Sequence, residues 1–403
     1  MNPQNEPILP VPGIRLGSAA AGIKYADRND LVVMELAEGS RCAAVFTRNA
    51  FCAAPVTVAR EHLAATAPRY LLINSGNANA GTGDEGLRAA RESCKALAAA
   101  RACAIDQILP FSTGVIGEPL PVDRIAVAVP DALTALHPDG WEAAARAIMT
   151  TDTVPKLASR RFTAGGRECV VTGMAKGSGM IRPDMATMLA YVATDAAVAP
   201  ALLHSCLKQA VAPSFNSITV DGDTSTNDAC VLVATGAAGG PEIIDWESSD
   251  YQALTAAVAE VCLALARAIV KDGEGATKLV EVHVEGATDG EEARRVAYTI
   301  AHSPLVKTAL FASDPNWGRI LAAVGRAGIE GLDIRAVELW LDDVCIVRNG
   351  GRDPGYAEEA GQRVMGQDEL TIRVLLGRGA AATTVLTCDL SYDYVRINAE
   401  YRT

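Results

Sequence analysis

The stretch GMAKGSGMIRPDMATMLAYVATD, residues 173–195, changes character at the peptide bond between Ala186 and Thr187. Before that bond, Gly177 and Pro183 indicate a loop, because glycine allows tight backbone paths and proline disfavours helix in the residue before it. After it, TMLAYVAT has the aliphatic, aromatic and β-branched residues of a buried strand. A threonine at the start of such a strand can attack the preceding carbonyl and then use the freed amine as its base. An ordinary loop-to-strand junction also explains the local pattern, so both interpretations stay open here.

The composition of the whole chain is that of a globular protein. It has 403 residues, of which 49% are hydrophobic and 21% charged, and its formal net charge of -12 argues against a nucleic-acid surface. The length allows two or three ordinary domains, or one large α/β unit with a smaller satellite. The first residues lack the basic and apolar regions of a signal peptide, and no run of about 18 uncharged apolar residues occurs, so we expect a cytoplasmic protein.

Cysteine and histidine show neither metal-binding nor catalytic spacing. The ten cysteines include no CxxC pair, which favours buried reduced thiols over a zinc ribbon or a thioredoxin-like site. The five histidines form no HExxH motif, and the chain has no GxSxG motif to partner them. We therefore expect no metal, and we expect nucleophilic chemistry, if present, to use a base other than histidine.

The loop NSGNANAGTGDEG contains glycines in the spacing of a dinucleotide-binding motif. Gly81, Gly83 and Gly86 match GxGxxG, and Asp106 follows about twenty residues later. In a Rossmann unit the strand leads directly into the first glycine, whereas here a longer polar segment separates Asn74 from Gly81. Turn formation and helix capping explain these glycines better than a dinucleotide does.

A second polar loop, in SFNSITVDGDTSTND, carries Asp221, Asp223 and Asp228. A calcium-binding EF-hand loop would need a differently placed glycine and a glutamate at its twelfth position, and the stretch has neither. We therefore interpret this loop as structural.

Strands and helices alternate through the rest of the chain. Residues 31–36 and 41–47 are expected to pair as a hairpin around Glu38 and Gly39, and residues 251–271 to form a long amphipathic helix.

Two turns carry candidate chemistry. ILPFSTGVIGEPLP predicts a strand that ends in a tight turn at Thr113 and Gly114, where a hydroxyl and an exposed amide either form an oxyanion hole or simply connect strand to helix. In KDGEGATK, Glu274 lies between two glycines, as a carboxylate presented on flexible backbone or as an ordinary solvated surface acid.

Together these stretches resemble one family, the ArgJ-type ornithine acetyltransferases, which are bifunctional glutamate N-acetyltransferases of arginine biosynthesis. The resemblance covers nearly the whole chain and is carried by NSGNANAGTG, STGVIG, MTTDT-x-PK, AKGSGMI-x-PDMATML, SFNSITVDGDTSTND, KDGEGATK, SDPNWGRI and the terminal NAEYRT.

The resemblance implies a precursor that cleaves itself between Ala186 and Thr187. The products would be an α chain of residues 1–186 and a β chain of residues 187–403, assembled as an α2β2 heterotetramer. The implied fold is α/β, with stacked β-sheets flanked by helices, of the ArgJ/DmpA-like self-processing N-terminal-nucleophile type, and with a smaller strand-rich C-terminal subdomain at about 280–403. Periodicity supports only a mixed α/β protein.

The resemblance also implies a mechanism. Thr187 would take the acetyl group of N2-acetyl-L-ornithine and pass it to L-glutamate in a ping-pong sequence, while Thr113 and Gly114 stabilise the oxyanion. The amine freed at residue 187 has an ordinary pKa near 8, so it can act as the base. The family's substrate-binding positions correspond to Thr153, Lys176, Thr187, Glu274, Asn398 and Thr403.

This interpretation requires no cofactor, although acetyl-CoA remains an alternative acetyl donor because no phosphate-binding motif decides the question. Two other functions stay open. One is a self-processing N-terminal-nucleophile amidase or aminopeptidase, which would release its acyl group to water. The other is a non-catalytic binding relative.

Overall fold

The computed structural model divides the chain into two compact units. The first comprises Met1–Gly177, Arg182–Asn216 and Thr224–Ile269, and the second comprises Ser178–Ile181, Ser217–Asp223 and Val270–Thr403. The structure describes residues 7–182 and 188–401. Ala186, Thr187 and Thr403, to which the sequence analysis assigned roles, lie outside the described residues.

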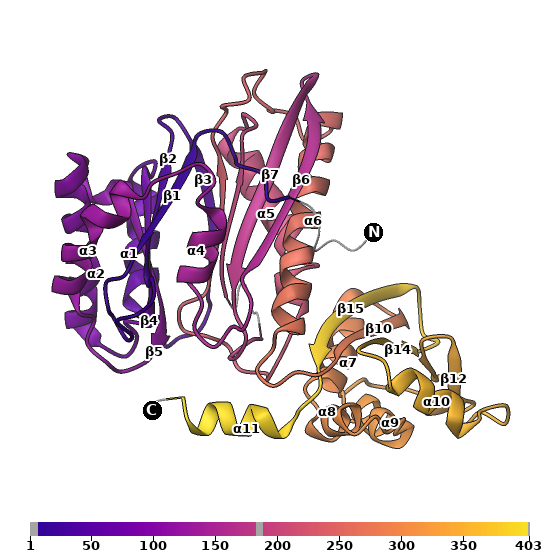
Figure 1. The fold of residues 1–403 in the computed structure, drawn as a ribbon. Coiled ribbons are helices and arrows are strands. Elements are labelled where there is room, and N and C mark those ends of the chain that lie inside the picture. The colour runs from indigo at the N-terminus through magenta and orange to yellow at the C-terminus, as the bar shows by residue number, and fades with distance from the viewer. Residues whose placement is uncertain (1–6, 183–187, 402–403) are drawn as a thin grey trace. The chain divides into compact units, whose positions relative to one another are not determined.

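Two β-sheets form the centre of the first unit (Figure 1). The four-stranded sheet has the order β1-β2-β4-β5 and the five-stranded sheet the order β3-β9-β8-β7-β6. Only the pairs β4/β5 and β8/β9 are parallel among these described strands. The strands are β1 (Ile14–Ala19), β2 (Leu31–Leu36), β3 (Arg41–Phe46), β4 (Tyr70–Asn77), β5 (Ile108–Val115), β6 (Lys156–Ala164), β7 (Arg167–Lys176), β8 (Leu189–Thr194) and β9 (Ala229–Ala234).

The two sheets pack face to face because each buries apolar side chains on the facing side. Leu71 and Phe111 of the first sheet share one core cluster with Tyr191 and Val231 of the second. The rings of Phe111 and Tyr191 meet edge to face, with centroids 5.3 Å apart. Strand side chains alternate between faces, so the neighbouring residues of the first sheet point outward into a separate cluster with helices.

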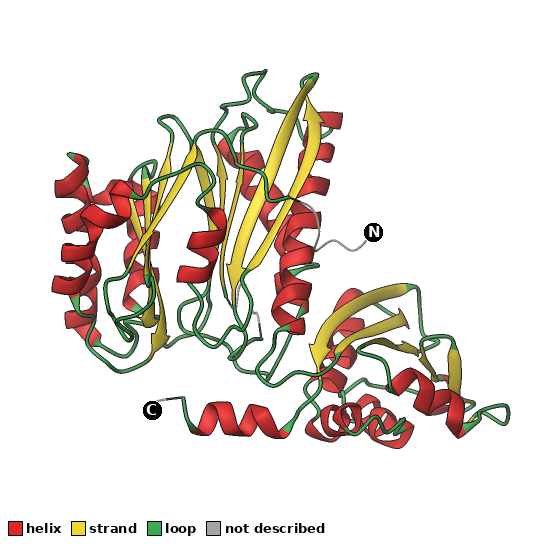
Figure 2. Ribbon diagram, viewed as in Figure 1, coloured by secondary structure: helices red, strands yellow, loops and turns green. Residues whose placement is uncertain are grey.

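Helices cover the outer faces of both sheets (Figure 2). α2 and α3 pack on the first sheet, and α5 and α6 on the second. The helices of this unit are α1 (Ala54–Ala65), α2 (Gly83–Arg101), α3 (Val122–Thr134), α4 (Trp141–Ala147), α5 (Pro200–Val211) and α6 (Ser249–Lys271). The predicted α/β architecture of stacked sheets flanked by helices is confirmed.

Helix α6 is long and apolar enough to cross a membrane, with a mean hydropathy of 1.9. Half of that apolar window is nevertheless buried inside the structure. Leu254, Val258, Val261 and Leu265 lie on one buried face at helical spacing, and the last two face Gly173 of β7. The helix therefore serves as a core helix here, as its predicted amphipathic pattern indicated.

The predicted hairpin of residues 31–36 and 41–47 is wrong. Both segments are strands, but β2 pairs with β1 and β4 in the first sheet, whereas β3 pairs with β9 in the second. The short turn around Gly39, whose φ is +83°, thus passes the chain from one sheet to the other. The pairing of a strand depends on its packing against segments far away in the sequence, and the residues of a local turn do not indicate those partners.

The second unit is built on one six-stranded sheet of order β13-β12-β11-β14-β10-β15. Its strands are β10 (Leu279–Ala287), β11 (Glu338–Leu341), β12 (Val344–Arg348), β13 (Gly351–Arg352), β14 (Glu369–Leu375) and β15 (Ala381–Cys388). Its helices are α7 (Gly290–Ala301), α8 (Pro304–Phe311), α9 (Trp317–Gly325), α10 (Glu358–Met365) and α11 (Tyr392–Ala399). Valines of β10 and alanines of α7 form the centre of its own core.

Candidate active site

Thr113 and Gly114 lie within the last three residues of β5, so the predicted turn begins later than expected. β5 runs parallel to β4, whose pairing becomes irregular at Gly76 and Asn77 beside them. Gly114 has a φ of +136°, and a Cβ atom there would lie 2.3 Å from the carbonyl carbon of Gly76. Only glycine fits where these two backbones approach so closely.

Buried asparagines hold the ends of β4 and β5 in place. The side-chain Oδ1 of Asn74 accepts a hydrogen bond from the Ser112 hydroxyl at 2.6 Å, and its Nδ2 donates to the backbone carbonyl of Asn77 at 2.9 Å. Asn77 in turn donates to the backbone carbonyl of Glu118 at 3.1 Å. Because these polar groups are paired in the interior, they fix the backbone that carries Thr113.

Asn227 connects this strand end to the start of the second sheet. Its Nδ2 donates to the carbonyl oxygens of Ala78 at 2.6 Å and Ser112 at 3.0 Å, and its Oδ1 accepts from the Thr226 hydroxyl at 2.6 Å. β9 begins two residues after Asn227 and runs parallel to β8. The residue after Ser112 is Thr113, so the oxyanion-hole candidates are held beside the common start of β8 and β9.

The start of β8 has a cationic residue on one side and an acidic residue on the other. Leu189, the first residue of β8, pairs with Lys176 at the end of β7 and with Ala229 at the start of β9. Asp228 directly precedes Ala229. Lys176 and Asp228 are both buried, at 9% and 2% exposure. Leu189, two residues after position 187, therefore lies between the strand end that carries Lys176 and the strand start that follows Asp228.

Asp152 is a buried, ionised carboxylate in the loop before β6. Its Oδ1 accepts hydrogen bonds from Lys156 Nζ and from the Gly177 amide, both at 2.7 Å, and its Oδ2 accepts from the Thr150 amide at 3.0 Å. Burial raises the pKa of Asp152, but the ammonium groups of Lys176 and Lys156 outweigh burial and lower it to about 2. Thr153, a predicted substrate contact, is the exposed residue that follows.

Asp228 is buried in a different electrostatic setting. Burial raises the pKa of its carboxyl well above the ordinary value, against a hydrogen bond from Ser225 and the charge of Lys176. Its Oδ2 has no hydrogen-bond partner within residues 7–182 and 188–401. Such a carboxyl can hold a proton at neutral pH, which a surface aspartate cannot.

In the second unit, Glu274 and Asn398 are brought together. Asn398 Nδ2, on α11, donates to Glu274 Oε2 at 2.7 Å. Glu274 is only 8% exposed, so the interpretation as a solvated surface acid is wrong. Its carboxylate fits because residue 179 is glycine: a Cβ on Gly179 would lie 2.3 Å from the carboxylate carbon. The pair offers an anionic oxygen and an amide for polar ligand groups.

The described cysteines and acidic residues give no metal centre. Among residues 7–182 and 188–401, no group of three or more His, Cys, Asp or Glu side chains is arranged to hold a metal ion. Burial raises the pKa of the Cys42, Cys94 and Cys230 thiols to about 12, so these thiols are neutral.

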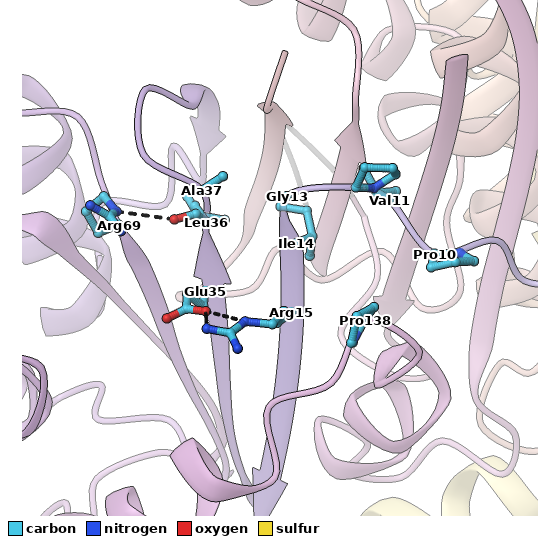
Figure 3. A pocket seen from close by; sticks show the side chains of 11 residues that line it. Pro10, Val11, Gly13, Ile14, Arg15, Glu35, Leu36, Ala37, Arg69 and Pro138 are labelled. Atoms are coloured by element: carbon cyan, nitrogen blue, oxygen red, sulfur yellow. Dashed lines mark hydrogen bonds and ion pairs between the residues drawn. The ribbon is translucent and has the colours of Figure 1, made fainter. Parts of the chain in front are cut away.

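Two hollows of the first unit are lined by residues other than the predicted site residues. One, of about 570 Å³, runs along β1 (Figure 3). Its charges are paired, since Arg15 Nε donates to Glu35 Oε2 at 2.6 Å and the Arg69 guanidinium lies 3.8 Å from the Glu38 carboxylate. Because these charges already have partners, a charged ligand would gain little electrostatic energy by binding here.

The other hollow, of about 530 Å³, is lined by the glycine-containing loop considered as a dinucleotide motif. Its lining includes three acidic residues, Glu85, Glu92 and Asp123, and one arginine, Arg88. This negative lining would repel a pyrophosphate, so the geometry agrees with turn and capping roles for the glycines.

Nearly the whole chain matches a single family model, described as the ArgJ family, over residues 15–403. The chain belongs to the ArgJ family. It is 63% identical over 396 residues to the arginine biosynthesis bifunctional protein ArgJ of Methylococcus capsulatus, covering 98% of this chain and 97% of that protein. It is 58% identical over 397 residues to the ArgJ of Psychrobacter arcticus, covering 98% of both.

An ArgJ crystal structure is also similar to this chain. The arginine biosynthesis bifunctional protein ArgJ from Bacillus halodurans is 40% identical and aligns with a TM-score of 0.50, covering 52% of this chain and 97% of that one. Family membership confirms the resemblance inferred from the motifs. The protein is thus an ArgJ-family enzyme of arginine biosynthesis.

The structure adds three ArgJ residues that sequence reasoning did not single out as site residues. Asp152 was part of the motif MTTDT-x-PK, and Asn227 and Asp228 were part of a loop interpreted as structural. For Asn227 and Asp228, a sequence signal was their position directly before the wholly apolar strand ACVLVA. All three residues are buried, and Asn227 also makes hydrogen bonds to residues more than a hundred positions away.

Proposed function

We propose that this ArgJ protein transfers the acetyl group of N2-acetyl-L-ornithine to L-glutamate through an acetyl-Thr187 intermediate. The observation that carries the proposal is the hydrogen bonding of Asn227, which joins the β5 end bearing Thr113 to the start of the strand pair that follows residue 187. A nucleophile and oxyanion donors must lie within one small region for acyl transfer, and this arrangement supports that proximity.

We propose that the precursor first cleaves itself between Ala186 and Thr187. The Thr187 hydroxyl oxygen attacks the Ala186 carbonyl carbon, the carbon–nitrogen bond breaks, and the hydroxyl proton passes to the leaving nitrogen, which becomes the free amine. Water then hydrolyses the ester, leaving a carboxylate on Ala186 and restoring the hydroxyl. The ArgJ chain from Bacillus halodurans supports this scheme, because nearly all of it corresponds to only about half of the present chain.

In the acetyl transfer, the freed amine of Thr187 accepts the hydroxyl proton while the oxygen attacks the acetyl carbonyl of acetylornithine. Thr113 and the Gly114 amide stabilise the oxyanion, ornithine leaves with the proton, and the acetyl group stays on Thr187 as an ester. The amine of glutamate then attacks that ester and restores Thr187. No cofactor takes part in this scheme, and acetyl-CoA would be a second donor of the same acetyl group.

Substrate binding is assigned to Thr153, Lys176, Thr187, Glu274, Asn398 and Thr403. The ammonium of Lys176 suits an α-carboxylate, and the carboxylate of Glu274 suits an ammonium. We further propose that residues 1–186 and 187–403 assemble as an α2β2 heterotetramer, which a native mass measurement would test. We also propose that this assembly is cytoplasmic and that residues of about 280–403 form a strand-rich subdomain.

Expression followed by denaturing electrophoresis tests the self-cleavage. The wild type is expected to give two bands and Thr187→Ala one full-length band, and the intact mass of the second fragment locates the cut. An N-terminus other than Thr187 would refute the assignment. A persistent full-length wild-type band without activity would favour a binding protein.

Product analysis tests the transfer. Incubation with acetylornithine and glutamate is expected to yield acetylglutamate, and predominant free acetate would instead indicate an amidase. A parallel incubation with acetyl-CoA measures the second donor. Thr113→Ala is expected to lower kcat by about 100-fold to 1,000-fold, the usual cost of losing one oxyanion donor.

A further inference from the structure

The chain that leads to the cleavage site is bound tightly within the second unit. The Ser178 hydroxyl donates to the Asp272 carbonyl at 2.6 Å, and the Glu274 amide donates to the Ser178 carbonyl at 2.9 Å. Gly179 has no room for a side chain beside the Glu274 carboxylate. These contacts fix the first half of residues 178–181.

Asp221 fixes the second half of the same segment. Its Oδ2 accepts a hydrogen bond from the Met180 amide at 2.6 Å, and its Oδ1 accepts one from the Ile181 amide at 2.9 Å. The Ile181 carbonyl accepts from the Val220 amide at 2.8 Å and from the Thr219 hydroxyl at 3.0 Å. Both backbone polar groups of Ile181 are therefore held by residues 219–221.

The backbone that Asp221 holds is in an unusual conformation. Met180 has a φ of +55°, a left-handed conformation that residues other than glycine seldom adopt without compensating contacts. Burial raises the pKa of Asp221, and the amides of Asp223, Met180 and Ile181 oppose that rise. A carboxylate that accepts several backbone amides is well suited to stabilise such a turn.

We propose that Asp221 is a positioning residue for self-cleavage: by holding the Met180 and Ile181 amides, it fixes the chain that leads to the Ala186–Thr187 bond. This inference rests on the proposed self-cleavage. The bond lies five residues after Ile181, so a fixed Ile181 sets the point from which the chain runs to that bond. Asp221 itself forms and breaks no bond in the reaction.

The test compares processing rates. Purified precursor, or a pulse-labelled culture, is followed over time by electrophoresis for the wild type and Asp221→Asn. The asparagine keeps the size but removes the charge and replaces one accepting oxygen with an NH2 group, which cannot accept a hydrogen bond. We therefore expect processing to slow by about ten-fold or more. Asp223→Asn is the matched control, because it removes the same charge from an exposed residue two positions away, and it should process within about two-fold of wild type.

Hydrogen exchange provides a readout that does not depend on processing. In the uncleavable Thr187→Ala precursor, adding Asp221→Asn should raise the exchange rates of the Met180 and Ile181 amides by about ten-fold, with the amides of β8 and β10 unchanged. A general loss of folding would instead raise exchange throughout the second unit.

The outcomes separate this inference from the proposed function. If the wild type does not process, self-cleavage itself fails. If the wild type processes and Asp221→Asn processes equally fast, or if exchange at Met180 and Ile181 does not change, the role of Asp221 is wrong while self-cleavage stands. Generally raised exchange across the unit would also overturn it, in favour of a purely structural role.

Discussion

Asp152 and Asp228 are two buried aspartates of the same unit, and both lie in the field of Lys176, yet their pKa values shift in opposite directions. The pKa of Asp152 falls to about 2, whereas that of Asp228 rises well above the ordinary value. Burial disfavours the charged form of both carboxyls, so burial cannot explain the difference.

The difference comes from direct contacts. Asp152 accepts hydrogen bonds from the Lys156 ammonium and from two backbone amides, whereas one oxygen of Asp228 has no described partner. For Asp152 the charges of Lys176 and Lys156 together outweigh desolvation, whereas for Asp228 the charge of Lys176 does not. Beside the start of β8, the protein thus keeps one carboxylate that is charged at neutral pH and one carboxyl suited to hold a proton.

Breaking the ion pair of Asp152 should have the largest effect. Lys156→Met leaves a buried carboxylate without its bound cation, so we expect the free energy of unfolding to fall by about 3–5 kcal/mol, measured by urea denaturation. Lys271→Met is the matched control, because Lys271 pairs with Glu369 at 2.8 Å near the surface and should cost about 1 kcal/mol or less. Equal costs for the two variants would contradict the distinction.

The pH dependence of stability sharpens the comparison. Because the folded pKa of Asp152 is about 2, its ionised form stabilises the protein above the unfolded pKa near 4, and this contribution is lost as the pH falls toward 2. Asp152→Asn should therefore be less stable than wild type at pH 6, and the difference should shrink by about 2–3 kcal/mol between pH 5 and pH 2. Denaturation of both proteins at several pH values measures this difference, and a constant difference would show that Asp152 is not ionised.

The sequence predicts some features of this fold and not others. The apolar run of β8 predicted a fully buried strand, and all six residues of Leu189–Thr194 are buried. The glycine motifs and the threonine after Ala186 indicated the family. Sequence proximity did not predict that β2 and β3 belong to different sheets, because strand pairing depends on distant partners.

The charge state of a buried side chain is equally invisible in the sequence. Lys156 follows Asp152 by four residues, a spacing that signals a pair only on a helix, whereas here the contact closes a loop that leads into β6. The sequence allowed Glu274 to be a surface acid, whereas its contacts with Gly179 and Asn398 show that it is buried. Such states follow from tertiary contacts, which local pattern does not encode.

An effect of opposite sign is expected at Asp228, and at pH 4 it is the smallest of the three. Because the pKa of Asp228 is raised in the folded protein, the unfolded chain releases this proton at a lower pH, near 4, than the folded protein does. The free energy of unfolding of the wild type therefore falls as the pH rises above about 4, whereas a side chain that does not titrate causes no such fall. Asp228→Asn should thus differ from wild type by about 1 kcal/mol or less at pH 4 and gain on it as the pH rises to 7. The same denaturation series used for Asp152→Asn measures this trend. A relative loss of stability for Asp228→Asn at higher pH would mean that Asp228 is ionised in the folded protein, and the contrast with Asp152 would then disappear.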